Sequence, residues 1–145
     1  MRAVGCYSAA ALVTSGARFG PACADTQKAY RHTPFIRVAE LFDVIPYDCV
    51  PVAVEITDQA VPLHSFEHPE RAFYIFGPED GSVRKDILER CKHHVYIPTR
   101  HCLNLGMTVN TVLYDRQAKQ LARGALGALE TISRYLDDPK VLVNT

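Results

Sequence analysis

Two stretches in the second half of the chain decide its fold: residues 72–81 read AFYIFGPEDG, and residues 95–110 read VYIPTRHCLNLGMTVN. The first begins with an apolar run typical of a buried strand, which ends abruptly at Gly77. The second begins with a very short strand, stops at Pro98, and continues as a helical pattern from Leu105. Because ligands of open α/β sheets bind beyond the carboxyl ends of strands, both stretches mark a candidate site.

Strands and helices alternate along the rest of the chain as well. Such alternation predicts a parallel sheet with helices on both of its faces. Residues 58–71 are polar and are expected to be irregular, and residues 137–145 are expected to form a loose tail. The other predicted elements are strands at Ala10–Thr14 and Val50–Ile56, and helices at Arg2–Tyr7, Thr26–Arg31, Val38–Val44, Val83–Cys91 and from Leu105 to about Tyr135.

Composition limits the possible classes of protein. The 145 residues suit one compact domain. Lys and Arg together number 16 and so do Asp and Glu, so the positive excess typical of nucleic-acid-binding domains is absent. Any contact with RNA must therefore come from a local patch or from dimerisation. Five cysteines, an odd number without a C-x-x-C pair, indicate a reducing compartment, and we expect the cytoplasm.

The N-terminal segment Met1–Ala24 has two interpretations. A positive residue, an apolar run and the sequence Ala22-Cys23-Ala24 imitate a secretory signal. Arg18 interrupts the stretch before the supposed cleavage site, which favours a helix followed by a buried strand. No apolar run approaches the roughly 20 residues that a membrane-spanning helix needs.

The two stretches that open this section together resemble motifs two and three of the SpoU (TrmH-like) family of SPOUT-class RNA methyltransferases. The family pattern is a strand ending in G-x-E-x-x-G, a helix, a short strand with I-P, and S-L/M-N before another helix. This chain has IFGPEDG, then VYIP, then CLNLGMTVN at a similar spacing. The resemblance extends from Arg2 to about Lys119 and is strongest over Phe73–Asp115.

The resemblance implies a fold and a cofactor. The fold is a single-domain α/β parallel sheet with a C-terminal deep trefoil knot, a feature that pattern alone would never predict. The knot loops of the family hold S-adenosylmethionine (AdoMet) in a bent form. Cys102 stands where the family usually has serine, and either residue offers the same backbone contact. The cofactor pocket that the resemblance implies consists of Val54, Glu55, Gly77, Ile97, Cys102 and Leu103.

Two residues are implied to be catalytic. Arg2 falls where the family places its motif-one arginine, in the pattern N-x-G-x-x-x-R, which is thought to act on the ribose 2′-hydroxyl. The asparagine and glycine of that motif, and the first strand, would lie before Met1. Asn104 matches the motif-three asparagine, which pins the knot loop or orients the substrate ribose, and it equally suits the cap of the following helix.

Further polar residues invite RNA or metal interpretations. Basic residues near the implied pocket are candidate phosphate contacts, with ordinary solvated charges as the alternative. Cys91, His93, His94, His101 and Cys102 are all types that bind metals, but their spacing matches no ligand pair, and neighbouring histidines on a strand point to opposite faces. We therefore expect no metal. The candidate RNA-binding residues are Arg18, Arg31, Arg100 and His101.

The favoured hypothesis is an AdoMet-dependent RNA 2′-O-ribose methyltransferase that acts on tRNA rather than rRNA. The resemblance implies a homodimer with the helix Leu105–Gln120 at its interface. The alternatives are a non-catalytic AdoMet- or RNA-binding module, in which motif one is incomplete, and a nucleotide-binding α/β protein without a knot.

Overall fold

The computed structural model describes residues 2–16, 31–78 and 80–124 of the chain. It is an α/β fold in which every strand pairing among these residues is parallel. The elements, with η for a short 3-10 helix, are α1 (Arg2–Cys6), β1 (Leu12–Ser15), β2 (Phe35–Val38), η2 (Leu41–Asp43), β3 (Val50–Val54), β4 (Val61–Pro62), η3 (Leu63–Ser65), β5 (Ala72–Phe76), α2 (Lys85–Leu88), β6 (His93–Tyr96) and α3 (Leu105–Ala122).

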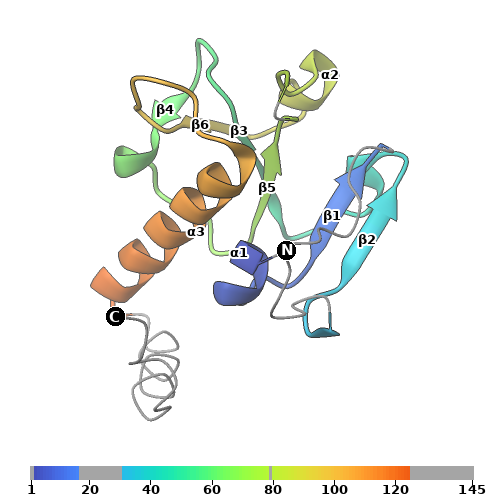
Figure 1. Cartoon of the computed structure of the whole chain (residues 1–145), viewed down its shortest axis with the longest axis horizontal. Helices are drawn as coiled ribbons and strands as arrows, with labels where there is room; N and C mark the ends of the chain where they lie inside the picture. The colour runs from blue at the N-terminus through green and yellow to red at the C-terminus, as the bar shows by residue number, and fades with distance from the viewer. Residues whose placement is uncertain (1, 17–30, 79, 125–145) are drawn as a thin grey trace.

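The described strands form two sheets rather than the single sheet that the sequence predicts. One has the order β1-β2, and the other has the order β4-β6-β3-β5. β6 follows β3 and β4 in the sequence, yet it lies between them in the sheet. Figure 1 shows α3 crossing beside the four-stranded sheet, with α1 next to α3 and the two-stranded sheet on the other side of β5. The parallel arrangement is confirmed, but the prediction of one continuous sheet is wrong for the described residues.

The predicted helix Val38–Val44 is wrong. Val38 is the last residue of β2, which pairs with β1 from Leu12–Phe35 to Ser15–Val38, and only Leu41–Asp43 is helical. The aromatic and β-branched residues of β2 suit a pleated strand, and pairing with β1 overrides the helical spacing of the apolar residues that follow. The irregular stretch 58–71 likewise contains two short elements, β4 and η3.

The long C-terminal helix is confirmed from Leu105 to Ala122, but it ends before the predicted limit near Tyr135. α3 ends at Ala122, and Gly124 has a φ of 74°, a conformation that glycine adopts most readily. The helix predicted at Val83–Cys91 is shorter and spans Lys85–Leu88. Most of the predicted helix Thr26–Arg31, the continuation toward Tyr135 and the tail 137–145 lie outside the described residues. No helix in the described part of the chain has the length and apolar character needed to cross a bilayer.

The core lies between the central strands and α3. Val52 of β3, Val95 of β6 and Val112 of α3 have no exposed surface, and Phe66 and Leu63 close the same cluster. Burying one such side chain completely contributes about 1.5–3 kcal/mol. Val112 is the one residue of α3 that is classed as buried, so apolar packing alone holds little of this 18-residue helix.

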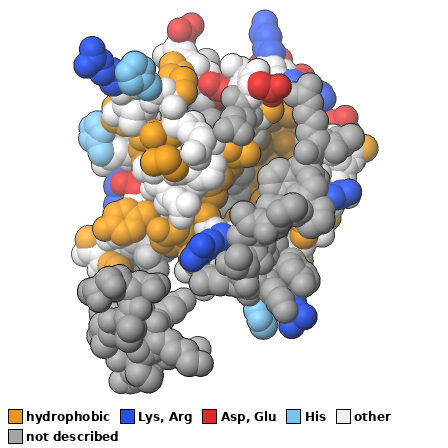
Figure 2. All heavy atoms as spheres, viewed as in Figure 1, with side chains coloured by type: hydrophobic (Ala, Val, Ile, Leu, Met, Phe, Trp, Pro, Cys, Tyr) orange, Lys and Arg blue, Asp and Glu red, His pale blue; other side chains and the backbone are white. Residues whose placement is uncertain are grey.

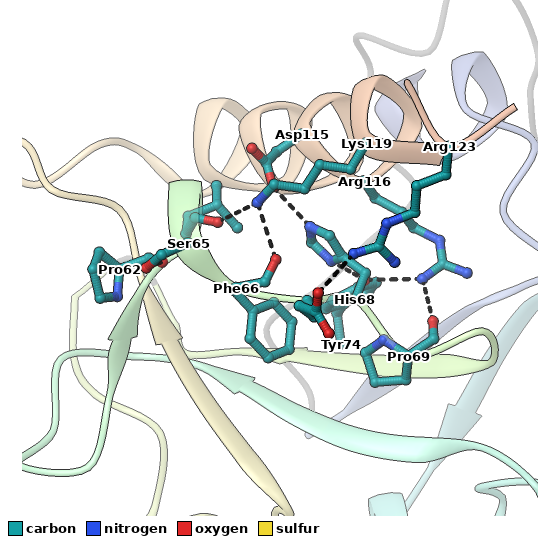
Figure 3. Close-up of polar contacts among 12 residues, drawn as sticks. Pro62, Ser65, Phe66, His68, Pro69, Tyr74, Asp115, Arg116, Lys119 and Arg123 are labelled. Atoms are coloured by element: carbon teal, nitrogen blue, oxygen red, sulfur yellow. Dashed lines mark hydrogen bonds and ion pairs between the residues drawn. The ribbon is translucent and has the colours of Figure 1, made fainter. Parts of the chain in front are cut away.

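Polar contacts supply the rest of the attachment of α3. Lys119 Nζ donates to the carbonyl oxygens of Leu63 and Phe66, at 2.6 and 3.0 Å. Arg116 donates to the carbonyl oxygens of Pro69 and Glu70, both at 2.6 Å. Figure 3 shows these cationic side chains reaching from α3 to the segment that joins β4 to β5. These carbonyl oxygens take no part in strand pairing, and the two cationic side chains donate hydrogen bonds to them.

A histidine with 3% side-chain exposure lies at the centre of these contacts. His68 Nε2 is 2.8 Å from Asp115 Oδ2, and His68 Nδ1 is 2.6 Å from the Tyr74 hydroxyl. A carboxylate only accepts, so Nε2 carries the proton and Nδ1 accepts from Tyr74. Burial lowers the pKa of His68, against the opposing effect of Asp115. We call His68, Tyr74, Asp115, Arg116 and Lys119 the α3 latch (Figure 3).

Candidate functional site

Three strands of the larger sheet end at one edge. Val54, the last residue of β3, pairs with Phe76 of β5 and with Val95 of β6. The residues that follow these strands are Glu55, Gly77 and Ile97, which the sequence places in a cofactor pocket. Together with Val54 itself, the structure therefore brings four of the six predicted pocket residues to one edge, the position at which open α/β sheets bind ligands.

Each oxygen of the Glu55 carboxylate accepts one backbone hydrogen bond at this edge. Its Oε2 accepts from the backbone N–H of Val83 at 2.9 Å, and its Oε1 accepts from the N–H of Ile56 at 3.0 Å. The backbone N–H of Glu55 itself donates to Val95 O at 3.0 Å. The side chain thus connects β3 to the loop between β5 and α2.

Gly77 lies next to the contact between Glu55 and Val83. A Cβ atom at this position would be 3.0 Å from the backbone nitrogen of Val83, 3.2 Å from the carbonyl carbon of Ser82 and 3.4 Å from Glu55 Oε2. These contacts are tighter than nine in ten of those that real Cβ atoms make. The strand end and the loop are therefore packed so closely that any side chain at this position would push the neighbouring backbone by a few tenths of an ångström.

The segment from Ile97 to α3 forms the other wall of the candidate site. Ile97 packs against the core cluster, and Leu103 is half-buried, whereas Cys102 is exposed. Within the segment, Thr99 Oγ1 donates to His101 O at 2.8 Å. The segment thus has a half-buried apolar side chain at each end, Ile97 and Leu103, and residues 98–102 between them are exposed.

Asn104 caps α3. Its Oδ1 accepts from the backbone N–H of Met107 at 2.8 Å, with φ −65° and ψ 159°, so the capping interpretation is confirmed. Its amide nitrogen makes no hydrogen bond with the described residues, and the side chain is exposed. One half of the amide therefore stabilises the helix, while the other half faces the space beside the loop.

We expect Asn104→Ala to lower the free energy of unfolding by about 1 kcal/mol, because the N–H of Met107 loses its partner. Asn104→Asp keeps an acceptor at the cap and should change that free energy by no more than a few tenths of a kcal/mol. Urea unfolding of the two variants measures the difference. Equal losses in both variants would contradict the capping role.

Arg2 is not at the edge where Glu55 and Gly77 lie. It is exposed and begins α1, which packs against α3. Figure 1 shows α1 well apart from α2 and from the carboxyl ends of β3 and β5. Within one copy of the chain, the two predicted catalytic residues are therefore separated, and only Asn104 borders the candidate site.

The predicted RNA-binding residues do not form one patch. Arg100 and His101 are exposed in the loop before α3, and Arg31 is exposed just before β2. Figure 1 shows these two segments on different sides of the molecule, and Arg18 lies outside the described residues. The described residues also contain no group of three or more His, Cys, Asp or Glu side chains arranged to hold a metal ion.

The sequence did not point to the α3 latch. Asp115 and Lys119 are four residues apart on a helix and form an ion pair at 2.6 Å, a contact that spacing alone predicts. His68 lies 47 residues from Asp115 in an apparently irregular stretch, and no local pattern marks it.

Comparison with known proteins decides the family. The family model described as the SpoU rRNA Methylase family matches residues 1–114. The chain belongs to the SpoU family. Comparison with curated proteins finds no significant match.

Solved structures of SpoU-type proteins share the fold of this SpoU chain. An rRNA methyltransferase from Sinorhizobium meliloti superposes with a TM-score of 0.72 at 16% identity, covering 81% of this chain and 49% of that one. A TrmH/SpoU tRNA-modifying enzyme from A. aeolicus gives 0.65 at 16% identity, covering 84% and 68%. AviRb from Streptomyces viridochromogenes, in complex with AdoMet, gives 0.66 at 16% identity, covering 83% and 54%. The chain thus spans about half the length of the first and third proteins.

Proposed function

We propose that this SpoU chain binds AdoMet at the shared edge of β3, β5 and β6 and transfers its methyl group to a ribose 2′-oxygen of RNA. The observation that carries the proposal is the convergence of Glu55, Gly77 and Ile97 at one sheet edge, next to the loop that Asn104 closes. We propose tRNA rather than rRNA as the substrate, since the tRNA-modifying relative is the one matched over the larger share of its length.

The residues at this edge suit AdoMet. Half-buried Ile97 and Leu103 offer apolar surface to an adenine ring, while the exposed backbone around Cys102 offers donors and acceptors to its polar edge. The lack of a side chain at Gly77 keeps the backbone accessible. When bound, the cofactor supplies an electrophilic methyl group. The chain supplies the pocket and holds the nucleophile in line.

The knot belongs to the same proposal. β6 lies between β3 and β4, so the connection from Glu55 to Ala60 has to pass around the strand that is inserted later. The chain then turns back through residues 97–104 into α3, which is attached beneath β4 by the α3 latch. A trefoil knot requires a later part of the chain to pass through a loop that an earlier part has formed.

Arg2 and Asn104 are the proposed catalytic residues, and a homodimer through α3 would bring them together. Met107 and Tyr114, seven residues apart on α3, are 54% and 63% exposed. Figure 2 shows hydrophobic side chains exposed on the face along which α3 runs. Such an apolar stripe is typical of an interface. Because α1 packs against α3, pairing through α3 places Arg2 of the partner subunit next to the interface.

The experiment has two stages. Calorimetry of the full chain with AdoMet tests the pocket, and transfer of radioactive methyl groups to tRNA and to rRNA tests the reaction. We expect Arg2→Ala to bind AdoMet normally but to lose at least a hundredfold in transfer, the range of one polarising group. Arg37→Ala, which removes another exposed arginine, is the control. Failure of the wild-type chain to bind AdoMet would overturn the proposal, and binding without transfer would favour a non-catalytic module.

Mixing variants tests whether the site is shared between subunits. If Arg2 acts on the partner's site, a mixture of inactive Arg2→Ala and Asn104→Ala chains forms heterodimers in which one site is intact, and activity partly returns. If Arg2 acts on its own site, every site in the mixture lacks one residue, and no activity returns.

A further inference from the structure

We infer that Glu55 is a positioning residue that fixes the shape of the candidate pocket by keeping its carboxylate bonded to the backbone rather than by turning it toward the cofactor. The inference rests on the proposed function, and it differs from the expectation that Glu55 is a cofactor ligand. Its physical basis is the use that the structure makes of the carboxylate.

Both oxygens of this carboxylate have backbone partners. Oε2 accepts from Val83, which is 6% exposed and anchors the loop before α2, and Oε1 accepts from Ile56 at the start of the loop between β3 and β4. A carboxylate that turned toward a ribose hydroxyl would leave the N–H of Val83 without an acceptor in a buried position, which is costly. The carboxylate therefore stays with the backbone.

The contact lies at a junction of three segments. Glu55 Oε2 is 3.4 Å from the position that a Cβ atom of Gly77 would take, and the same Cβ atom would lie 3.0 Å from Val83 N. The end of β3, the end of β5 and the loop before α2 are thus in close contact at this point.

A second side chain ties the same segments at a different point. His94 of β6 is 3.0 Å from Leu88 O through Nε2 and 2.8 Å from Thr57 Oγ1 through Nδ1. A carbonyl only accepts, so Nε2 carries the proton and Nδ1 accepts from Thr57. Two residues of the connection from β5 to β6 are therefore held to residues 55–57. Val83 is bonded to Glu55, and Leu88 is linked to Thr57 through His94.

The chemistry of the tie requires a carboxylate. Both partners are N–H donors, and only a carboxylate offers two acceptor oxygens. In Glu55→Gln, one donor of the pair has to face an amide NH₂ group and loses its hydrogen bond. Glu55→Gln is therefore the sharpest variant, since it keeps the size of the side chain and removes one acceptor.

The test combines NMR spectroscopy with binding. In the wild-type protein without ligand, the amide proton of Val83 should resonate downfield because it is bonded to a carboxylate, and it should stay there when AdoMet is added. In Glu55→Gln it should move upfield, AdoMet should bind about tenfold more weakly, the equivalent of one hydrogen bond to a charged group, and kcat at saturating AdoMet should stay within about twofold. Glu89→Gln, whose side chain is 66% exposed beside Lys85, is the matched control and should change neither quantity.

The outcomes separate this inference from the proposed function. A wild-type chain that does not bind AdoMet overturns the proposed function, whatever the Val83 signal does. A wild-type chain and a Glu55→Gln variant that bind AdoMet equally well overturn the positioning role alone. So does an upfield shift of the Val83 amide proton when AdoMet is added to the wild-type chain, because that shift would mean that the carboxylate has left Val83.

Discussion

His68→Ala should lower the free energy of unfolding by about 3 kcal/mol, a large share of the stability of a domain of this size. The substitution leaves a cavity where a side chain with 3% exposure was packed. It also removes the donor that Asp115 uses and the acceptor that Tyr74 uses, at 2.8 and 2.6 Å. Tyr74 is itself buried enough that its pKa is raised. Asp115 keeps its ion pair with Lys119, but the Tyr74 hydroxyl loses its acceptor, and an unpaired donor in such a position is costly.

Urea unfolding of the wild-type chain and of two histidine variants measures this effect. His64→Ala is the control, because His64 belongs to η3, a few residues away, but is exposed. Its free energy of unfolding should stay within about 0.5 kcal/mol of the wild-type value. Equal losses in the two variants would contradict the α3 latch.

The same variants predict a dependence on pH. The pKa of His68 is lowered in the folded protein, mainly by burial, so below its ordinary value of 6.5 the unfolded chain binds protons more readily than the folded one. The contribution of His68 is complete above that pH and is lost as the pH falls below it. The difference in unfolding free energy between wild-type and His68→Ala should therefore narrow on acidification. The pKa of His93 is lowered as well, so a smaller slope should remain in both proteins.

Gly77→Ala should weaken AdoMet binding by more than about tenfold, which corresponds to 1.4 kcal/mol. The new Cβ atom would lie 3.0 Å from a backbone nitrogen and 3.2 Å from a backbone carbon, and backbone cannot turn aside as a flexible side chain can. Either β5 or the loop before α2 must move, and both border the proposed pocket. Calorimetry with AdoMet measures the loss directly.

Gly81→Ala is the control in the same loop. Among the described residues, its Cβ atom would meet only the side chain of Pro78, at 3.5 Å, an ordinary contact. AdoMet binding should therefore change by less than about twofold, within the range of surface substitutions. Normal binding by Gly77→Ala, or equal damage from both substitutions, would show that the close approach at Gly77 has no part in the pocket.

The parts of the fold that the sequence predicts are those with strong local signals. The apolar runs at β3 and β5, the parallel pairing implied by alternating elements, and the cap at Asn104 all follow from neighbouring residues. β2 is not predicted, and its last residue, Val38, is assigned to a helix, because the partner strand β1 lies more than 20 residues earlier in the chain. The α3 latch and the contact between Glu55 and Val83 also join distant residues, and no periodic pattern encodes such contacts.

The position of β6 also has a consequence for the order in which the molecule can form. β4 has no described strand partner other than β6, and β6 is made 30 residues after β4. During synthesis, the larger sheet therefore cannot be completed until the chain has been made as far as Tyr96. Contacts of this kind close long loops and slow folding. Until they form, the unpaired edge of a strand can pair with another chain and cause aggregation. We expect chains interrupted before His93 to aggregate rather than to persist as smaller folded pieces.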